Sequence, residues 1–291
     1  MSRPGGKYLI VNADDYGVCG ATNRAVEELF DAGLLSSASL MAVAPGAEQA
    51  ARVSGRKGYP VGIHLTINSD SAENLWHSLT AAPSLGGGAG LPAKMSVLAL
   101  KARSADVSAE IEAQYRFLCD SGCVPDHADN HCATLYGVNG RLFFINAFDF
   151  CAAHHLPFRF PKNPGFIERQ LGRKLPGIGF LHGQVLAAAR RRGVLLLDDM
   201  ISNPCSIRII GNYESLRGYY LDALNNIGEG ITELFFHPSY PAGEAPSEEN
   251  DEWRKRELEL RFLQSGDLHA AAAGGGIKIV SWAQAFGNGG K

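Results

Sequence analysis

The sequence predicts an α/β fold in which parallel strands alternate with outer helices. Apolar runs of strand length recur along the 291 residues, and stretches with helical periodicity separate most of them. A chain that alternates in this way forms either an open parallel sheet or a closed α/β barrel. Eight strand candidates favour the barrel, and a hydrophobic content of 45% is sufficient for one large core.

The first unit sets the pattern for the rest of the chain. The apolar run Tyr8–Ala13 predicts a strand, and a helical pattern over about 21–32 stops at Gly33. Further strand candidates follow at 38–44, 61–66, 126–131, 158–160, 194–197, 231–236 and 277–280. Helices are expected near 45–54, 104–121, 139–154, 179–192, 213–227 and 248–264.

The most loop-like stretch lies at about 68–95, where Gly86–Gly90 is almost all glycine and Pro92 follows. One interpretation is a flexible excursion at one end of the sheet, and the other is a linker between domains. Because the 67 residues before it are too few to close a barrel, we expect a single domain over 1–291.

Charge and composition exclude several classes of protein. A net charge of −3 and a pI near 6.3 offer no global positive field for nucleic acid or anionic membranes. We find no apolar run near the roughly 18 residues of a membrane-spanning helix, and Met1–Lys7 lacks the apolar stretch of a signal peptide. We therefore expect a cytoplasmic protein whose six scattered cysteines are free thiols.

Active sites of parallel α/β folds lie at the carboxyl ends of the strands, so polar residues that finish apolar runs are candidates. Asp14 and Asp15 close the first strand. One of the two carboxylates can ligate a metal ion while the other serves as a base, or an aspartate can cap the following helix. His64 lies inside a strand candidate, as a metal ligand or as a core histidine.

Two later segments add further histidines. On a strand, His127, Asp129 and His131 would share one face, whereas on a helix His127 and His131 would meet at positions i and i+4. His237 ends an apolar run before a proline, where it could donate a proton or cap the loop. Asp and His ligands that arrive from different strands describe a catalytic metal site.

These segments occur in a characteristic order: Asn12-Ala-Asp14-Asp15-Tyr16-Gly17, Gly62-Ile-His64-Leu65, His127-Ala-Asp129-Asn-His131 and Leu234-Phe-Phe-His237-Pro238. Together they resemble the motifs of the YdjC family of carbohydrate deacetylases, which includes ChbG and HpnK. The resemblance runs from about residue 8 to about 285, with a late strand at 277–282.

The resemblance implies a distorted, TIM-barrel-like (β/α) barrel and a metal-dependent hydrolase. Its reaction would remove the N-acetyl group from an acetylated amino sugar, such as a chitooligosaccharide, and release acetate. One divalent ion, Zn²⁺ or Mg²⁺, would be held by Asp15, His64 and His131. Asp14 would then be the base that activates water, and His237 the acid.

The resemblance also assigns residues around this centre. His127, Asp129 and Arg159 would lie in the second shell of the metal or line the substrate pocket. The chain departs from the family at Cys132 and Ala133, where members commonly carry further histidines, and this departure affects the substrate more than the reaction. A homodimer is also implied by the family.

Two other functions stay open at this point. A metal-dependent phosphoester hydrolase would favour two metal ions about 3.5–4 Å apart and a basic clamp for the phosphate. The sequence offers one clear triad and no obvious clamp. A non-catalytic carbohydrate-binding relative would have lost Asp14 or a metal ligand, and this chain keeps them.

Overall fold

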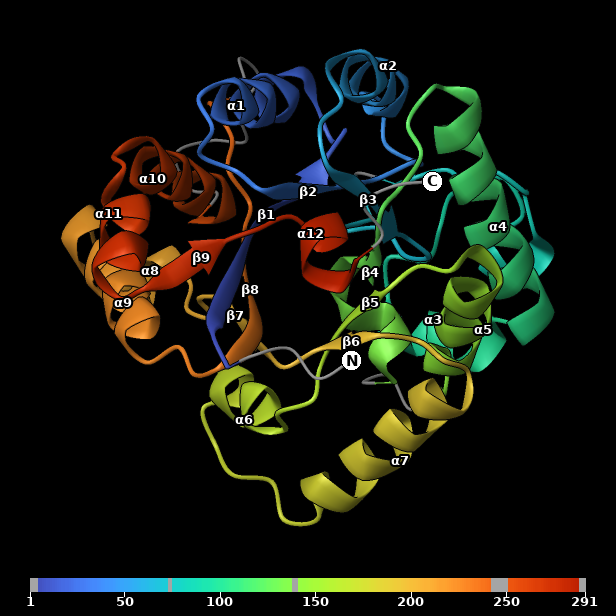
Figure 1. Ribbon diagram of the computed structural model, residues 1–291. Helices are drawn as coiled ribbons and strands as arrows, with labels where there is room; N and C mark the ends of the chain where they lie inside the picture. The colour runs from blue at the N-terminus through green and yellow to red at the C-terminus, as the bar shows by residue number, and fades with distance from the viewer. Residues whose placement is uncertain (1–4, 73–74, 138–140, 242–250, 288–291) are drawn as a thin grey trace.

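A nearly closed barrel of parallel strands forms the centre of the computed structural model, which describes residues 5–72, 75–137, 141–241 and 251–287 (Figure 1). The strand order is β6-β5-β4-β3-β2-β1-β8-β7, with β9 beside β1. All of these pairings are parallel. The strands are β1 (Lys7–Tyr16), β2 (Ser37–Leu40), β3 (Val61–Leu65), β4 (Ala128–Asn130), β5 (Phe158–Pro161), β6 (Leu196–Leu197), β7 (Asp199–Ile201), β8 (Gly230–Phe236) and β9 (Ile277–Ile279).

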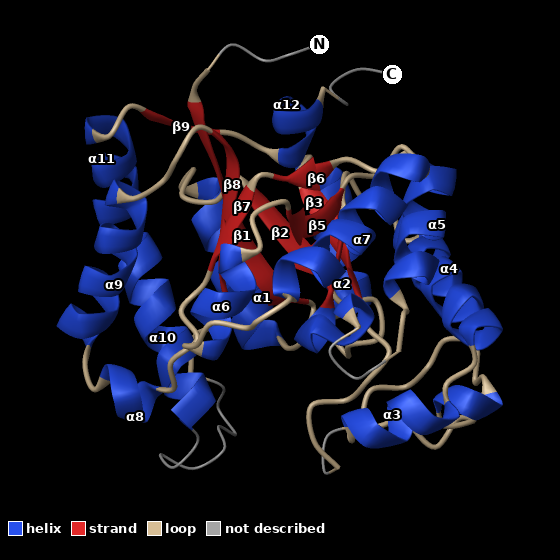
Figure 2. Cartoon of the chain, turned by 90° about the horizontal axis from the view of Figure 1, so that it is seen from below, coloured by secondary structure: helices blue, strands red, loops and turns tan. Residues whose placement is uncertain are grey.

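Helices surround the barrel on its outside (Figures 1 and 2). They are α1 (Gly20–Asp31), α2 (Ala47–Lys57), α3 (Met95–Lys101), α4 (Ser104–Asp120), α5 (Phe144–His154), α6 (Gly165–Leu171), α7 (Ile178–Arg191), α8 (Ile207–Ile210), α9 (Tyr213–Asn225), α10 (Asp251–Gln264), α11 (Asp267–Gly274) and α12 (Trp282–Phe286). Among the described residues, none of these helices has the length and apolar character needed to cross a membrane.

The predicted α/β barrel is confirmed, with differences at the ends of elements. The strand expected at 38–44 ends at Leu40, and the one expected at 126–131 is limited to Ala128–Asn130. The helix expected from 139 begins at Phe144, and that expected from 248 begins at Asp251. Residues 139–140 and 248–250 lie outside the described residues.

The barrel closes at a junction that the sequence did not show. The two ends of the sheet, β6 and β7, are consecutive in the chain and are separated only by Asp198. The backbone N–H of Asp198 donates to the carbonyl of Ile231 in β8 at 2.9 Å, which bonds this junction to the neighbouring strand. The predicted strand at 194–197 ends before β7, which the sequence analysis did not predict.

The amino-terminal end of the barrel is covered by α12, which lies across the barrel centre in Figure 1. Strand β9 pairs with Lys7–Leu9 at the start of β1, and this pairing brings α12 to that end. Trp282 is fully buried, and its ring stacks on His127 with the centroids 4.6 Å apart. The opposite, carboxyl-terminal end of the strands is where the candidate side chains meet.

Candidate metal centre

A β-bulge at the end of β1 turns two adjacent carboxylates toward the same region. On β1, Ala13 pairs with Ala38 and Tyr16 with Leu40, so β1 has one residue more than β2 over this interval. Asp15 has a positive φ of 61°, which a non-glycine residue rarely adopts. On a regular strand Asp14 and Asp15 would point to opposite faces. At the bulge both carboxylates instead face one region, where Asp15 contacts His64 and His131 and Asp14 lies near His64 and His237.

The predicted ligands Asp15, His64 and His131 lie together and are buried. Asp15 Oδ1 is 3.4 Å from His64 Nε2 and 3.4 Å from His131 Nδ1. The same oxygen is buried and accepts no hydrogen bond from the described residues. Ligand atoms about 2.0–2.1 Å from a tetrahedral zinc ion lie about 3.4 Å apart, so the three side chains fit one divalent ion.

Asp129 holds the His64 ring in the orientation that a metal ligand needs. His64 Nδ1 donates to Asp129 Oδ1 at 2.7 Å, which leaves Nε2 directed toward Asp15. Burial works against a charged imidazole, but the Asp129 carboxylate and the nearby Asp15 and Asp14 raise the pKa of His64 to about 10. Arg159 and His64 in turn lower the pKa of Asp129 against the opposing effect of burial.

Arg159 connects Asp14 to two further carboxylates inside the barrel. Its guanidinium donates to both oxygens of Asp14 at 2.7 Å and to both oxygens of Glu233 at 2.8 Å. Asp129 Oδ2 lies 2.7 Å from the same group. The Arg159 side chain is only 3% exposed, so its charge serves this network and does not face the solvent. Asn12 Nδ2 also donates to Asp14, at 2.7 Å.

His237 lies on the solvent side of Asp14. Its Nε2 is 3.9 Å from Asp14 Oδ2, and its side chain is 36% exposed. Buried Glu259, on α10, accepts a hydrogen bond from the His237 backbone N–H at 2.7 Å, and its Oε2 lies 3.9 Å from Nδ1. His237 can therefore reach a bound molecule while its backbone is held in place.

Residues 8–273 match the family model described as YdjC-like protein. The chain belongs to the YdjC-like family. Over 128 residues it is 35% identical to a carbohydrate deacetylase of Geobacillus stearothermophilus, covering 43% of this chain and 49% of that protein. Over 127 residues it is 35% identical to a chitooligosaccharide deacetylase of Proteus mirabilis, covering 42% and 48%.

The chain thus spans about half the length of these curated relatives. A solved structure from Enterococcus faecalis, of a protein proposed to cleave cellobiose phosphate, superposes with a TM-score of 0.71 at 22% identity. This alignment covers 95% of the present chain and 98% of the other. It shows that the two proteins share the barrel fold.

The three remaining predicted residues of this YdjC-like protein lie behind the triad. Asp129 and Arg159 contact His64 and Asp14 directly, as described above. His127 lies deeper, where its Nε2 is 3.3 Å from Ser39 Oγ, and Ser39 donates to Asp129 at 2.6 Å. The His127 ring fills space that a Cβ on Gly62 would occupy, since that atom would lie 2.2 Å from the ring.

The helix alternative for 127–131 is wrong, and the strand alternative holds except at its last residue. His127 and Asp129 follow the strand alternation, but His131 lies past the end of β4, at the start of a 3₁₀ helix over His131–Tyr136. Cys132, the next residue, has a positive φ of 51°. Its Sγ is 3.3 Å from His131 Nε2.

Sequence reasoning missed three charged residues at this centre. Arg256 Nη2 donates to Asp15 Oδ2 at 2.5 Å, and Asp70 Oδ1 accepts from His131 Nε2 at 2.5 Å. Glu233 is fully buried in β8. Glu233 could have been recognised from the sequence, because it lies inside the apolar run 231–236 and an unpaired charge is unfavourable to bury. Arg256 and Asp70 had no comparable signal.

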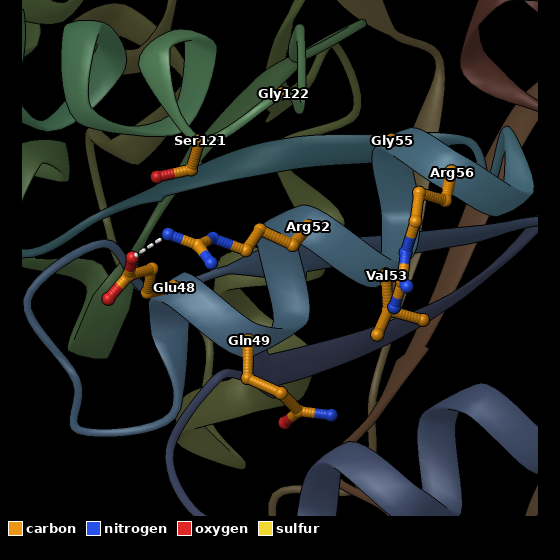
Figure 3. Close-up of a pocket in the computed structure, with 8 residues that line it drawn as sticks. All are labelled: Glu48, Gln49, Arg52, Val53, Gly55, Arg56, Ser121 and Gly122. Carbon is orange, nitrogen blue, oxygen red and sulfur yellow. Dashed lines mark hydrogen bonds and ion pairs between the residues drawn. The ribbon is translucent and has the colours of Figure 1, made fainter.

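A groove of about 620 Å³ lies elsewhere, on the outer side of α2 (Figure 3). It is lined by Glu48, Gln49, Arg52, Val53, Gly55, Arg56, Ser121 and Gly122. Figure 3 shows Arg52 paired with Glu48 across one turn of the helix. None of the predicted site residues is among the residues that line this groove.

Proposed function

We propose that this YdjC-like protein is a metal-dependent hydrolase that removes the N-acetyl group from an acetylated amino sugar and releases acetate. The observation that carries the proposal is Asp15 Oδ1, which accepts no hydrogen bond from the part of the chain that the structure describes. It lies 3.4 Å from an imidazole nitrogen of both His64 and His131, with Asp14 beside it. The names of the two deacetylase relatives support a carbohydrate substrate, including a chitooligosaccharide.

Asp15, His64 and His131 would hold one divalent ion. Two imidazole nitrogens and one carboxylate suit Zn²⁺, whereas Mg²⁺ prefers oxygen ligands in an octahedron. The 3.4 Å separations also suit a tetrahedral site. We therefore propose Zn²⁺ ahead of Mg²⁺. A bound divalent ion lowers the pKa of water toward about 7 and polarises the acetyl carbonyl.

Asp14 would take the proton from the attacking water. Arg159 and Asn12 donate to its two oxygens and fix the plane of the carboxylate. His237 would donate a proton to the departing amine, because its Nε2 lies beside Asp14 and its ring is partly open to solvent. General acid and base groups placed in this way contribute about 10²–10⁴-fold each to a rate.

The phosphoester alternative requires a cationic clamp. Arg159 is buried and bound by three carboxylates, so its guanidinium is not free for a phosphate. Arg256 donates through Nη2 to Asp15, and its Nη1 is buried without a hydrogen-bond partner among the described residues, so this guanidinium does not form an exposed clamp either. Deacetylation therefore stays the first proposal. A cytoplasmic location, a homodimer and a single domain over 1–291 stay predictions.

The test is acetate release from N-acetylglucosamine, diacetylchitobiose and longer chitooligosaccharides, measured on chelated protein with and without added Zn²⁺ or Mg²⁺. We expect metal-dependent release, and an Asp14→Asn variant that still binds metal but whose kcat is lower by about 10²–10⁴-fold. Full activity in that variant would remove Asp14 from the mechanism. No release from any sugar by metal-loaded wild-type protein would contradict the proposed function and direct the search to phosphoesters.

A further inference from the structure

We infer that Arg256 is a positioning residue for the metal ligand Asp15, which it holds so that only one carboxylate oxygen faces the ion. The inference rests on the proposed metal site. Arg256 lies on α10, 241 residues after Asp15 in the chain, and belongs to none of the family motifs that point to the centre.

The two oxygens of Asp15 have different surroundings. Oδ2 accepts a hydrogen bond from Arg256 Nη2 at 2.5 Å. Oδ1 has no hydrogen-bond partner among the described residues and faces the two imidazoles. Because Arg256 holds Oδ2 on the side away from the imidazoles, Oδ1 is the oxygen that Asp15 presents to the ion. In this geometry one carboxylate oxygen of Asp15 faces the proposed ion, and the other accepts a hydrogen bond from a residue that does not bind the ion.

Asp15 needs such a partner because its backbone conformation is unfavourable and does not by itself fix the direction of its side chain. A non-glycine residue rarely adopts a φ of 61°, so the surroundings must hold Asp15 in this conformation. The last torsion of an aspartate is broad, so the carboxylate plane is set by its contacts. A buried carboxylate without a cation is also costly. Arg256 supplies both the contact and the charge.

Arg256 is partly buried, packs on a residue of its own helix and is bonded through its backbone to the loop after β8. Its side chain is 16% exposed, and its guanidinium lies 5.3 Å from the ring centre of Trp253. Its backbone carbonyl accepts from the N–H of Ser239 at 3.4 Å. Ser239 Oγ in turn accepts from Thr22 Oγ1 in α1 at 3.1 Å. These contacts connect α10 to α1 and to the loop after β8.

Positioning and simple electrostatics predict opposite signs for the loss of Arg256. A positive charge beside a ligand repels a divalent cation, so electrostatics alone predicts tighter metal binding in Arg256→Met. If Arg256 instead orients Asp15, the same substitution weakens binding, because the carboxylate is free to turn. Loss of an outer partner of a metal ligand typically costs about 10–100-fold in affinity.

The experiment measures the Zn²⁺ dissociation constant by competition with a chromophoric chelator, together with the visible spectrum of the Co²⁺-loaded protein. The proteins are wild type, Arg256→Met, Arg256→Lys and a matched control, Arg254→Met. Arg254 is an exposed residue of the same helix, so its substitution removes the same charge without a described contact to Asp15.

We expect Arg256→Met to bind Zn²⁺ about 10-fold or more weakly, with an altered Co²⁺ spectrum. Arg256→Lys should recover part of the loss, and Arg254→Met should match wild type. Equal or tighter binding by Arg256→Met would overturn the inference. If circular dichroism shows that this variant does not fold, wild-type affinity in Arg256→Lys would overturn it. Wild-type protein that binds no Zn²⁺ would instead overturn the metal site itself.

Discussion

Two neighbouring aspartates have separate surroundings in this site. Asp14 is bound by Arg159 and Asn12, whereas Asp15 faces two imidazoles and Arg256. The bulge in β1 allows this division, because it gives the two side chains a common direction but different neighbours. Adjacent carboxylates that would repel each other are thereby each matched to a cationic group.

Arg159 balances three buried carboxylates, so its loss should be severe. Replacing it with Met leaves Asp14, Asp129 and Glu233 without their shared cation, and we expect the free energy of unfolding to fall by about 3–5 kcal/mol. Urea unfolding followed by circular dichroism measures the change. Arg52→Met is the control, since Arg52 and Glu48 form an exposed pair worth less than about 1 kcal/mol. Equal losses of unfolding free energy in the two variants would show that the buried network contributes no more to stability than the exposed pair.

At the scale of residues, the sequence predicted the centre of the site better than its surroundings. Asp15, His64 and His131 were candidates because each is ionisable and follows or interrupts an apolar run, and the family resemblance then selected them as the ligands. Arg256 and Asp70 lie on segments that only tertiary folding brings to the site, and single charged residues on a helix or a loop are ordinary surface features. Their partners could not be inferred from spacing.

Glu110 on α4 fixes part of the predicted excursion at 68–95. Its carboxylate is buried and accepts hydrogen bonds from the hydroxyls of Ser78 and Thr80 and from the backbone N–H groups of Leu79 and Thr80. Gln114, one turn further along α4, donates to it as well. Glu110 therefore holds the turn at 78–80 of the excursion against α4.

Glu110 should make stability depend on pH. Burial opposes its charge, but the hydrogen bonds from Gln114, Ser78 and Thr80 outweigh burial and lower the pKa. A carboxyl with a lowered folded-state pKa stabilises the fold above its unfolded pKa of about 4.3 and loses that contribution as the pH falls. Glu110→Gln should therefore be less stable than wild type at pH 7, with the difference shrinking toward pH 3.

Urea unfolding at several pH values between 7 and 3 measures this difference. Glu48→Gln, which changes an exposed glutamate, serves as the control and should follow wild type closely. If the free energy of unfolding of Glu110→Gln differed from that of wild type by the same amount at every pH, the loss would have a steric cause. The charge of Glu110 would then not contribute to stability.

At the scale of elements, the long periodic segments were predicted, whereas several of the shortest elements were not. The helices α1, α4, α7 and α9 lie within a few residues of their expected ranges. The strand β7 and the helices α8 and α12 have three to five residues each, too few for a periodicity to show. Tertiary contacts determine such short elements.

Over the whole molecule, the proposed ion would join parts of the chain that are distant in sequence. Asp15 ends β1, His64 lies in β3 and His131 follows β4, so the site exists only when the barrel is assembled. A ligand that binds only the folded state at 100 times its dissociation constant stabilises it by about 2.7 kcal/mol. We expect chelation to lower the melting temperature and Zn²⁺ to restore it.

Thermal melting of chelated protein, with Zn²⁺ added in steps, measures this stabilisation. The Asp15→Asn variant should show little of the shift, because it lacks the anionic ligand that faces both imidazoles. A shift of equal size in Asp15→Asn would place the bound zinc elsewhere on the protein.

The alternation of strands and helices was enough to predict the barrel, since parallel strands require crossover connections. How the barrel closes was not predictable, because β6 and β7 pair with different neighbours although only Asp198 separates them. A sequence pattern reports local periodicity and does not report which two strands complete the ring.

The pairing of β1 also has a consequence for how the protein is made. One edge of this strand pairs with β2, which follows within about twenty residues, but the other edge pairs along its length with β8, from Lys7 opposite Gly230 to Ala13 opposite Phe236. During synthesis on the ribosome, that second edge has no native partner until residues beyond 230 have emerged. An apolar strand with an open edge is a template for aggregation. We therefore expect the chain to be most prone to aggregation before β8 is available to pair with β1.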